Sequence, residues 1–273
     1  MSEKKRLDQL IFDQGLAPSR ERAKAMIMEG RVYFQNQKYD KPGTPMPSDA
    51  KLEIRGNDMP YVSRGGLKLE KAMTCFPISL MGKTAMDIGA STGGFTDCML
   101  QKGASKVYSI DVGYGQLAWK LRTDPRVINL ERTNVRYLTK EQVPEPIDFF
   151  SVDVSFISLR LVLPVARNFL KEGGEAVCLI KPQFEAGREK VGKKGVVREK
   201  STHKEVIDAI VSFVLETGFS VKGITFSPVK GPEGNIEYLI YLKKAEVPVL
   251  AVPVDSAALV DESHKVLNGG SSL

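Results

Sequence analysis

Residues Met86-Asp87-Ile88-Gly89-Ala90-Ser91-Thr92-Gly93-Gly94-Phe95-Thr96 decide the fold that we expect of this chain. A strand-like run, Thr84–Ile88, leads into the glycines, and a helix-like run follows them. Such a turn presents backbone N–H groups at the carboxyl edge of a parallel sheet and lets a ligand approach the main chain closely. A plain tight turn between a strand and a helix would use the same residues, so the glycines alone do not establish a binding site.

An acidic residue at the end of the next strand-like run favours a nucleoside site. The run Lys106–Ile110 leads to Asp111, twenty-three residues after Ile88. A carboxylate at this place can accept hydrogen bonds from both hydroxyls of a ribose. A dinucleotide-binding loop has glycine at the position of Ser91, so that a pyrophosphate can approach. The pattern therefore favours S-adenosylmethionine over a nicotinamide dinucleotide.

Strand-like and helix-like runs alternate from about Tyr61 to Lys244, which is typical of βαβ units around a mostly parallel sheet. A helical apolar stripe marks residues 202–217, and Gly218 ends it. We predict an α/β, Rossmann-like class I methyltransferase domain, in which the last two strands pair antiparallel. The strand candidates are Thr84–Ile88, Lys106–Asp111, Val127–Leu130, Ile147–Asp153, Ala176–Ile180, Val221–Phe226 and Ile236–Leu242.

The N-terminal part of the chain has the pattern of a separate, small α+β module. Apolar residues at helical spacing span Arg6–Phe12, and Ser19 is placed to cap a second short helix. Val32–Phe34 and Lys51–Ile54 have strand character. Prolines and a Gly- and Ser-rich end predict a flexible C-terminal tail. The predicted parts are a module at 5–57, a linker at 58–66, a methyltransferase domain at 67–244 and the tail at 245–273.

The composition indicates a globular cytoplasmic protein. Of the 273 residues, 42% are hydrophobic and 26% are charged. No apolar run reaches the roughly 18 to 20 residues that cross a bilayer, and the N-terminus lacks the apolar core of a signal peptide. Three separated cysteines favour a reducing compartment, and they match no metal spacing, so we predict no metal site. A net charge of +6 permits an anionic partner without proving one.

The acceptor chemistry is expected at the ends of the fourth and fifth strands. Asp153-Val154-Ser155-Phe156 stands where exocyclic-amine methyltransferases carry Asn/Asp-Pro-Pro-Tyr, and no cysteine has the setting of a pyrimidine-attacking nucleophile. Lys181 could orient or deprotonate a hydroxyl, although an exposed strand-end lysine is the simpler interpretation. Phe156 and Phe184 could stack on a flipped base or serve in packing. His203 is most simply a surface histidine.

Five segments of the chain carry a family resemblance: Tyr61–Leu69, Asp87–Phe95, Asp153–Ser158, Lys181–Glu185 and Gly234–Tyr238. Together they resemble the TlyA family of ribosomal RNA 2′-O-methyltransferases, long known as hemolysins. The resemblance covers residues 5 to 244. The methyltransferase half is similar to the FtsJ type, and the N-terminal module is similar to an RNA-binding domain of the ribosomal-protein S-four type.

The resemblance implies a catalytic Lys-Asp-Lys-Glu tetrad. Lys68 would help to hold the acceptor nucleotide, and Asp153 would steady the catalytic ammonium near the methyl donor. Lys181 would orient and activate the ribose 2′-hydroxyl for in-line attack on the methyl group, and Glu237 would complete the charge network. From the residues alone, Lys68 is a helix-surface lysine and Glu237 is a strand-face acid.

The resemblance also implies the residues around S-adenosylmethionine. Asp111 would bind the ribose of the cofactor. Related enzymes place an acid beside the adenine just after the third strand; this chain has no clear counterpart, and Asn134 is the candidate there. The other cofactor-binding candidates are Asp87, Gly89, Ser91, Gly93, Gly94 and Phe95.

Basic residues in both halves of the chain are the candidates for RNA binding. The resemblance puts several of them on the RNA-facing helix and turn of the N-terminal module. Residues Gly187–Arg198, which we call the basic loop, could grip phosphates around the target ribose or could be solvated and flexible. The candidates are Arg6, Arg20, Arg22, Lys24, Arg31, Arg64, Arg188, Lys193 and Lys194. The expected partner is ribosomal RNA or a ribosomal subunit, with no membrane and no stable protein partner.

Two other classes of function stay open. A membrane-acting hemolysin would agree with the older family name, but the chain lacks a spanning segment and a long amphipathic helix. A non-catalytic RNA-binding protein with a degenerate methyltransferase domain would need neither the tetrad nor the cofactor loop, and this chain has both.

Overall fold

The structure is a computed structural model in which residues 4–28, 30–55, 59–231 and 233–269 are described. The chain forms two compact units, residues 1–58 and 59–273. Residues 56–58, around the start of the expected linker, and residues 270–273 of the expected tail lie outside the described residues. The later part of the expected linker is packed, since Tyr61 is buried and a Cβ on Gly66 would lie 2.3 Å from its ring. Residues 61–66 therefore belong to the larger unit instead of spacing the two.

The N-terminal unit is a small α+β module, as the sequence predicts. Its helices are α1 (Leu7–Asp13) and α2 (Arg20–Met28), and the Arg22 backbone N–H donates to the Ser19 hydroxyl at 3.1 Å, which caps α2. One antiparallel pair, β1–β4, and one sheet in the order β3-β2-β5 pack with the helices around a separate apolar core. The strands are β1 (Lys4–Arg6), β2 (Val32–Phe34), β3 (Gln37–Tyr39), β4 (Pro45–Pro47) and β5 (Glu53–Ile54).

A seven-stranded sheet forms the centre of the larger unit. Its order is β11-β12-β10-β9-β6-β7-β8, and β12 runs antiparallel to both of its neighbours. The other pairs are parallel, so the carboxyl ends of β6 to β10 meet at one edge. The strands are β6 (Thr84–Ile88), β7 (Lys106–Ile110), β8 (Val127–Leu130), β9 (Ile147–Val152), β10 (Leu170–Ile180), β11 (Phe219–Phe226) and β12 (Tyr238–Lys244). The predicted α/β class and the antiparallel pairing of the last two strands are confirmed.

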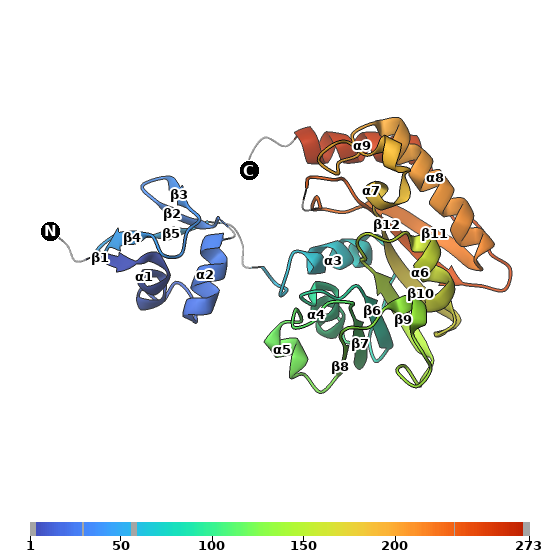
Figure 1. The fold of residues 1–273 in the computed structure, drawn as a ribbon, viewed down its shortest axis with the longest axis horizontal. Coiled ribbons are helices and arrows are strands. Elements are labelled where there is room, and N and C mark those ends of the chain that lie inside the picture. Colours follow the sequence, from blue (N-terminus) through green and yellow to red (C-terminus); the bar gives the residue numbers. More distant parts are fainter. Residues whose placement is uncertain (1–3, 29, 56–58, 232, 270–273) are drawn as a thin grey trace. The chain divides into compact units, whose positions relative to one another are not determined.

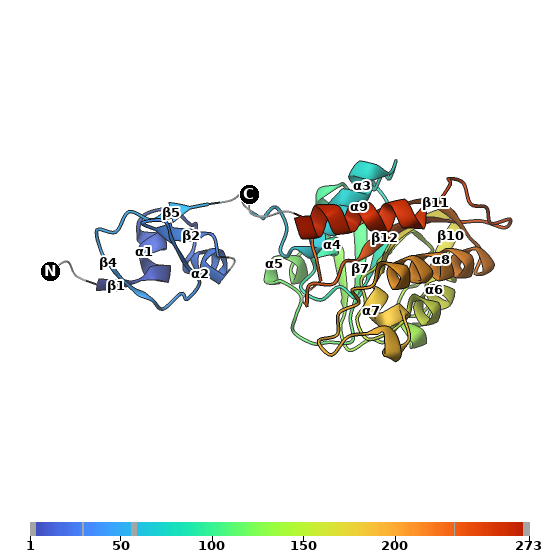
Figure 2. The same ribbon diagram turned by 90° about the horizontal axis from the view of Figure 1, so that it is seen from above.

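Helices cover both faces of this sheet, which gives three layers (Figures 1 and 2). Because successive side chains of a strand point to opposite faces, Ala85 enters one apolar core while Met86 and Ile88 enter the other. One layer holds α3 (Gly65–Cys75), α4 (Gly94–Gln101) and α5 (Trp119–Arg122). The other holds α6 (Leu159–Arg167), α8 (Lys200–Glu216) and α9 (Ser256–Gly269). Short turns complete the unit: η1 (Val135–Tyr137), α7 (Pro182–Glu185) and η2 (Arg188–Lys190).

The prediction of a flexible tail is wrong for residues 245–269. The Val221 N–H donates to the Val249 carbonyl oxygen at 3.1 Å, and the Ala251 N–H donates to the Val221 carbonyl oxygen at 3.0 Å, so the chain runs beside β11. Helix α9 then packs beside α8 and buries Val260 (Figure 1). Val260 and Leu267 are spaced for one helix face, but the nearby prolines and the polar end of the chain hid this signal.

The interpretation of His203 as a surface residue is also wrong. His203 is fully buried near the start of α8, on the face that carries Val206. One ring nitrogen lies 2.9 Å from the Tyr238 hydroxyl and the other lies 3.0 Å from the Val197 carbonyl oxygen. Burial lowers the pKa of His203, so the neutral ring fits this site.

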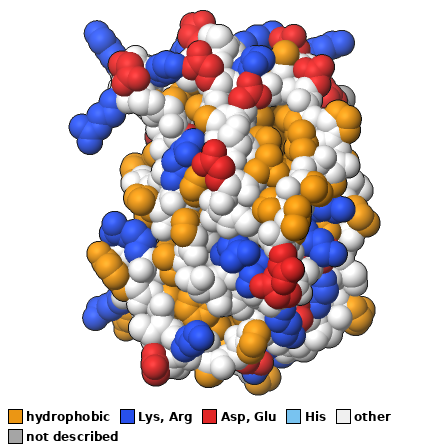
Figure 3. Space-filling model, turned by 90° about the vertical axis from the view of Figure 1, so that its right-hand side faces the viewer, with side chains coloured by type: hydrophobic (Ala, Val, Ile, Leu, Met, Phe, Trp, Pro, Cys, Tyr) orange, Lys and Arg blue, Asp and Glu red, His pale blue; other side chains and the backbone are white. Residues whose placement is uncertain are grey.

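Acidic and basic side chains are interspersed on the face shown in Figure 3, with apolar side chains between them. The net charge of +6 is therefore not gathered into one basic surface on that face.

Candidate active site

The four predicted catalytic side chains meet in one chain of alternating charge at the carboxyl edge of the sheet. Lys181, after β10, pairs with Asp153, after β9, with 2.5 Å between Nζ and Oδ1. Lys68 Nζ, on α3, lies 3.3 Å from Asp153 Oδ2 and 2.7 Å from Oε2 of Glu237, which precedes β12. The four side chains are only 1% to 17% exposed. Segments far apart in the sequence therefore build one buried ionic network.

Neighbouring charges stabilise the ionised groups of this network. Burial alone would raise the pKa of Asp153, but the two lysine ammoniums hold that pKa below its ordinary value. Burial would lower the pKa of Lys68, and the carboxylates of Asp153 and Glu237 outweigh this effect and raise it. Asp153 and Lys68 therefore stay charged, and they fix the position of Lys181, whose Nζ also donates to the Ser155 hydroxyl at 3.3 Å.

Asp87 supports the glycine loop from inside the fold. Its carboxylate is fully buried and accepts hydrogen bonds from the Thr96 N–H at 2.9 Å, the Thr96 hydroxyl at 2.8 Å and the Ser151 hydroxyl at 2.9 Å. Burial raises the pKa of Asp87 to about 6. The prediction that Asp87 binds the cofactor directly does not agree with this geometry, because no part of the side chain reaches the surface. Asp87 instead joins β6 to α4 and β9.

Close packing explains the glycines of the loop. A Cβ on Gly89, where φ is +85°, would lie 2.4 Å from the Asp153 carbonyl oxygen. A Cβ on Gly93, where φ is +95°, would lie 2.3 Å from the Leu121 side chain of α5. Glycine is therefore required at both positions for backbone conformation and for space.

Helix α5 is attached to this loop. The Ala118 N–H donates to the Thr92 carbonyl oxygen at 3.1 Å, and Leu121 packs beside Gly93. Trp119, the first residue of α5, is 75% exposed. Three loop residues that were predicted to contact the cofactor are buried: Gly93, Gly94 and Phe95. They shape the loop, and they do not line the cavity that is described next.

A cavity of about 950 Å³ opens beside the glycine loop. One part of it is lined by four of the cofactor-binding candidates: Gly89, Ser91, Asp111 and Asn134. The Asp111 carboxylate accepts from the backbone N–H groups of Ser91 and Gly113, both at 2.7 Å, and each oxygen has a further lone pair. The volume of the cavity, its closely approachable glycine and its carboxylate fit a nucleoside cofactor.

Asp153, Phe156 and Phe184 line the other part of the cavity. Phe156 is 91% exposed and has a φ of +65°, in the left-handed region that bulky residues rarely adopt. Its ring centroid lies 5.2 Å from that of Phe184. Phe156 is therefore not a core residue, although its ring contacts that of Phe184.

Two predicted RNA-binding arginines of the N-terminal unit share one buried carboxylate. Asp8 is fully buried and lies 3.0 Å from Arg6 Nε and 3.1 Å from Arg20 Nη2. The two arginine side chains remain 56% and 42% exposed. Asp8 therefore fixes both cations while leaving them accessible. Three further candidates, Arg22, Lys24 and Arg31, are half-buried in the same unit.

The remaining RNA-binding candidates lie in the larger unit. Arg64 is exposed at the start of α3, and Arg188 lines the cavity on the side of Phe184. Lys193 and Lys194 are exposed in the basic loop and are not part of the cavity wall. The structure thus brings one of these four cations to the candidate active site.

Sequence reasoning missed Gln183 in the cavity wall. Its amide nitrogen donates to Glu237 Oε1 at 3.5 Å, which extends the tetrad by one residue. Its amide oxygen is buried and has no hydrogen-bond partner among the described residues. Its position two residues after Lys181, at a strand end, is the signal that could have identified it.

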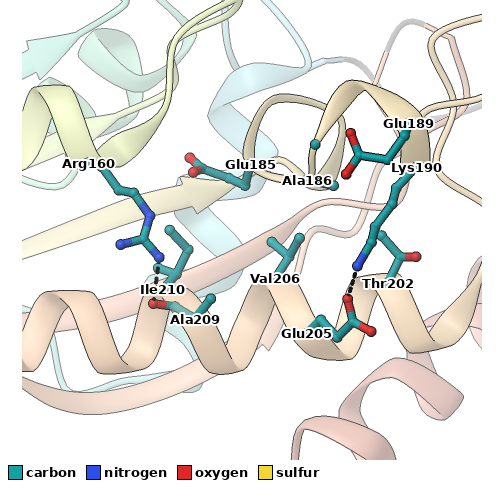
Figure 4. Close-up of a pocket in the computed structure, with 11 residues that line it drawn as sticks. Arg160, Glu185, Ala186, Glu189, Lys190, Thr202, Glu205, Val206, Ala209 and Ile210 are labelled. Carbon is teal, nitrogen blue, oxygen red and sulfur yellow. Dashed lines mark hydrogen bonds and ion pairs between the residues drawn. The ribbon is translucent and has the colours of Figure 1, made fainter.

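A second cavity, of about 190 Å³, lies between α7 and α8 (Figure 4). Glu185 forms one side, and its carboxylate accepts from the Ser158 hydroxyl at 2.6 Å and the Leu159 N–H at 2.8 Å, which caps α6. Lys190 pairs with Glu205 across the cavity (Figure 4). No tetrad residue lines this cavity, so we do not assign the chemistry to it.

The described residues contain neither a metal cluster nor a membrane-spanning helix. No group of His, Cys, Asp and Glu side chains in that part of the chain is arranged to hold a metal ion. No helix among those residues is long and apolar enough to cross a membrane. The cysteines Cys75, Cys98 and Cys178 are free thiols.

Comparison with known families agrees with this architecture. Residues 61–244 match the model of the FtsJ-like methyltransferases, and residues 5–48 match the model of the S4 domain. The chain therefore belongs to the FtsJ-like methyltransferase family, and within it to the TlyA group. It is 38% identical to the 16S/23S rRNA (cytidine-2′-O)-methyltransferase TlyA of Mycobacterium tuberculosis, over 99% of this chain and 100% of the relative.

Relatives with the older name are also similar to this chain. The chain is 41% identical to Hemolysin A of Brachyspira hyodysenteriae, over 86% of this chain and 98% of the relative. A solved structure from Streptococcus thermophilus, also described under the hemolysin name, is 47% identical with a TM-score of 0.79 and covers 98% of each chain. The hemolysin name thus accompanies the methyltransferase architecture described above.

Proposed function

We propose that this protein transfers a methyl group from S-adenosylmethionine to a ribose 2′-hydroxyl of ribosomal RNA. The observation that carries the proposal is the buried chain Lys181–Asp153–Lys68–Glu237, which reaches a nucleoside-sized cavity through Asp153. Membership of the FtsJ-like family and the activity in the name of the tuberculosis relative support it.

The cofactor half of the cavity is assigned to residues after β6, β7 and β8. The Asp111 carboxylate accepts hydrogen bonds from the cofactor ribose, and Gly89 and Ser91 allow close approach of the main chain. Asn134 lies at the adenine side. When bound, S-adenosylmethionine would supply an electrophilic methyl group on a cationic sulfur, and this sulfur would leave as a neutral thioether when an oxygen attacks the methyl carbon.

The acceptor half is assigned to residues after β9 and β10. Lys181 holds the 2′-oxygen in line with the methyl group. After its ammonium has released a proton to solvent, the neutral amine takes the hydroxyl proton as the oxygen–carbon bond forms. Asp153 holds Lys181, and Lys68 and Glu237 hold Asp153, so the network acts by positioning. Phe156 stacks on the base of the target nucleotide.

The RNA-binding surface is assigned to two places. The exposed arginines around Asp8 belong to a unit that matches the S4 domain, and Arg188, Lys193 and Lys194 belong to the basic loop beside the cavity. With ribosomal RNA as the substrate, the protein acts in the cytoplasm, where ribosomes are.

The proposal is tested with Lys181→Met and, as a matched control, Lys140→Met at an exposed lysine. Methyl transfer from radiolabelled S-adenosylmethionine is measured on ribosomal RNA from a strain that lacks this gene, and the modified nucleotide is mapped. Loss of the proton acceptor should slow transfer at least about a hundredfold while cofactor affinity is kept.

Four results would contradict the proposal. Full activity of Lys181→Met would remove the assigned chemistry, and a methyl group on a base would remove the assigned acceptor. Failure to bind S-adenosylmethionine even with RNA present would favour a non-catalytic RNA-binding protein. Lysis of cells by the wild-type protein and equally by Lys181→Met would favour the hemolysin function.

A further inference from the structure

The basic loop is anchored at its C-terminal end by two buried polar side chains. Asn235 is 3% exposed, and its amide oxygen accepts from the Val197 N–H at 3.0 Å while its amide nitrogen donates to the Gly195 carbonyl oxygen at 2.8 Å. The Val197 carbonyl oxygen faces a ring nitrogen of the buried His203. Both backbone polar groups of Val197 are therefore bonded by side chains from other elements, which fixes the loop there.

These contacts also define the tautomer of His203. A carbonyl oxygen only accepts, so the ring nitrogen Nε2 beside Val197 carries the proton. The other nitrogen, Nδ1, then accepts from the Tyr238 hydroxyl. The anchor is thus a neutral hydrogen-bond network with each partner in one role, which favours a single loop conformation.

The tip of the loop is a formed turn. The Gly195 N–H donates to the Gly192 carbonyl oxygen at 2.8 Å, and the Gly192 N–H donates to the Val196 carbonyl oxygen at 3.1 Å. Gly195 has a φ of +71°, which the turn requires. The turn holds Lys193 and Lys194 at its centre, and both side chains are exposed.

The loop encloses a hollow with an excess of positive charge. The hollow has a volume of about 440 Å³, and Lys190, Lys193, Lys194 and Arg198 line it together with Glu189 and Glu199. Lys190 is already paired with Glu205 of α8 (Figure 4), which ties the first half of the loop to that helix. Lys193, Lys194 and Arg198 are therefore the cations that can receive an anion in this hollow.

We propose that the basic loop is a preformed site for a phosphate of the RNA backbone, and that Asn235 is the residue that sets its shape. This rests on the proposed function, and it describes a loop that is ordered before RNA binds, in place of the solvated and flexible loop that the sequence left open. Cations on a preformed loop bind a phosphate more tightly than cations on a flexible loop, because less chain entropy is lost on binding. Asn235 lies two residues before Glu237, so the same segment places the phosphate site and one member of the tetrad.

The first test compares Asn235→Ala with Asn168→Ala, a control at an exposed asparagine. In the wild-type protein the Val197 amide should be protected from hydrogen exchange, and Asn235→Ala should remove that protection. Affinity for purified ribosomal RNA should fall about tenfold, because the variant has to order the loop on binding. The slope of log affinity against log salt should become shallower by about one to two, as lysine–phosphate contacts are lost.

A double-mutant cycle separates positioning from other roles of Asn235. In a Lys193→Ala/Lys194→Ala background, Asn235→Ala should cause no further loss of RNA affinity, because it acts through those lysines. An equal loss in both backgrounds would overturn the proposal. So would a fall in kcat at saturating RNA with KM unchanged, since Asn235 would then act on Glu237 and not on the loop.

Two further arms keep the proposal testable. If Asn235→Ala does not fold, Gly195→Ala distorts the turn without a steric clash and should weaken RNA binding in the same direction. Inorganic phosphate should displace RNA from the wild-type protein more strongly than potassium chloride of equal ionic strength, and this excess should disappear in Lys193→Ala/Lys194→Ala; phosphate that binds the hollow without displacing RNA would assign the hollow to a free anion and overturn the proposal. If the wild-type protein binds RNA in this way but transfers no methyl group, the proposed function fails while this inference stands.

Discussion

Replacing Lys68 by methionine tests whether the tetrad is one interdependent unit. The Lys68 side chain is 10% exposed and its ammonium contacts both Asp153 and Glu237. Its removal leaves Glu237, which is 1% exposed, without an ion-pair partner among the described residues. Breaking a buried ion pair by removing one partner costs about 3 to 5 kcal/mol, because the remaining charge stays buried and uncompensated. We expect Lys68→Met to destabilise the folded protein by this amount.

The measurement is urea unfolding of the full chain followed by circular dichroism, with the midpoint and the slope m compared between variants. Lys68→Met/Glu237→Gln removes both charges of the pair and should be more stable than Lys68→Met alone by about 1 to 3 kcal/mol. The penalty of Lys68→Met should shrink on acidification, since a protonated carboxyl group is less costly to bury than a charged one.

The control for this prediction is Lys140→Met, at an exposed lysine, which should stay within about 0.5 kcal/mol of the wild-type protein. A cost of Lys68→Met below about 1 kcal/mol, typical of exposed pairs, would refute the reasoning. A penalty that does not depend on pH, or a double variant no more stable than the single one, would refute it as well.

Three further predictions concern other parts of the larger unit. Burial raises the pKa of Asp87 from 3.8 to about 6, so the folded state binds more protons at this carboxyl group than the unfolded state, and the stability from the group is lost as pH rises from 3.8 to about 6. Asp87→Asn should flatten the dependence of stability on pH in this range, and an unchanged dependence would count against the prediction. Phe156→Ala should change stability by less than about 0.5 kcal/mol but slow RNA methylation about tenfold or more, whereas Phe156→Tyr should keep the rate; equal rates for all three proteins would exclude stacking. Val260→Ala should lower the unfolding free energy by about 1 to 3 kcal/mol in the same urea assay, and no loss would mean that α9 does not pack on α8.

The sequence was most informative about residues whose position follows from the neighbouring sequence, such as a residue at the end of a strand or a glycine in a turn. The runs before Gly89, Asp111 and Lys181 have the pattern of buried strands, and parallel strands bring their carboxyl ends to one edge. These patterns are enough to predict that the cofactor loop, Asp111 and Lys181 lie near one another. Lys68 and Glu237 are 169 positions apart, and no local pattern joins them; only the family resemblance did.

Long-range partners explain what the sequence could not predict. Asp87 has the residue type and position of a ligand-binding acid, but Thr96 and Ser151 bond its carboxylate inside the fold. His203 lies in the first turn of α8, and its burial depends on Val197 and Tyr238, which belong to other segments. In both cases the side chain's role follows from distant groups that happen to satisfy its hydrogen bonds.

The attachment of α5 to the glycine loop gives the protein an optical reporter of its own. Trp119 is the single tryptophan of the chain, and it follows directly on Ala118, whose N–H is bonded to the Thr92 carbonyl oxygen. Its emission therefore comes from the larger unit alone, next to the segment that a nucleoside would contact. Titration with S-adenosylmethionine can be followed by intrinsic fluorescence, without a label and without RNA present.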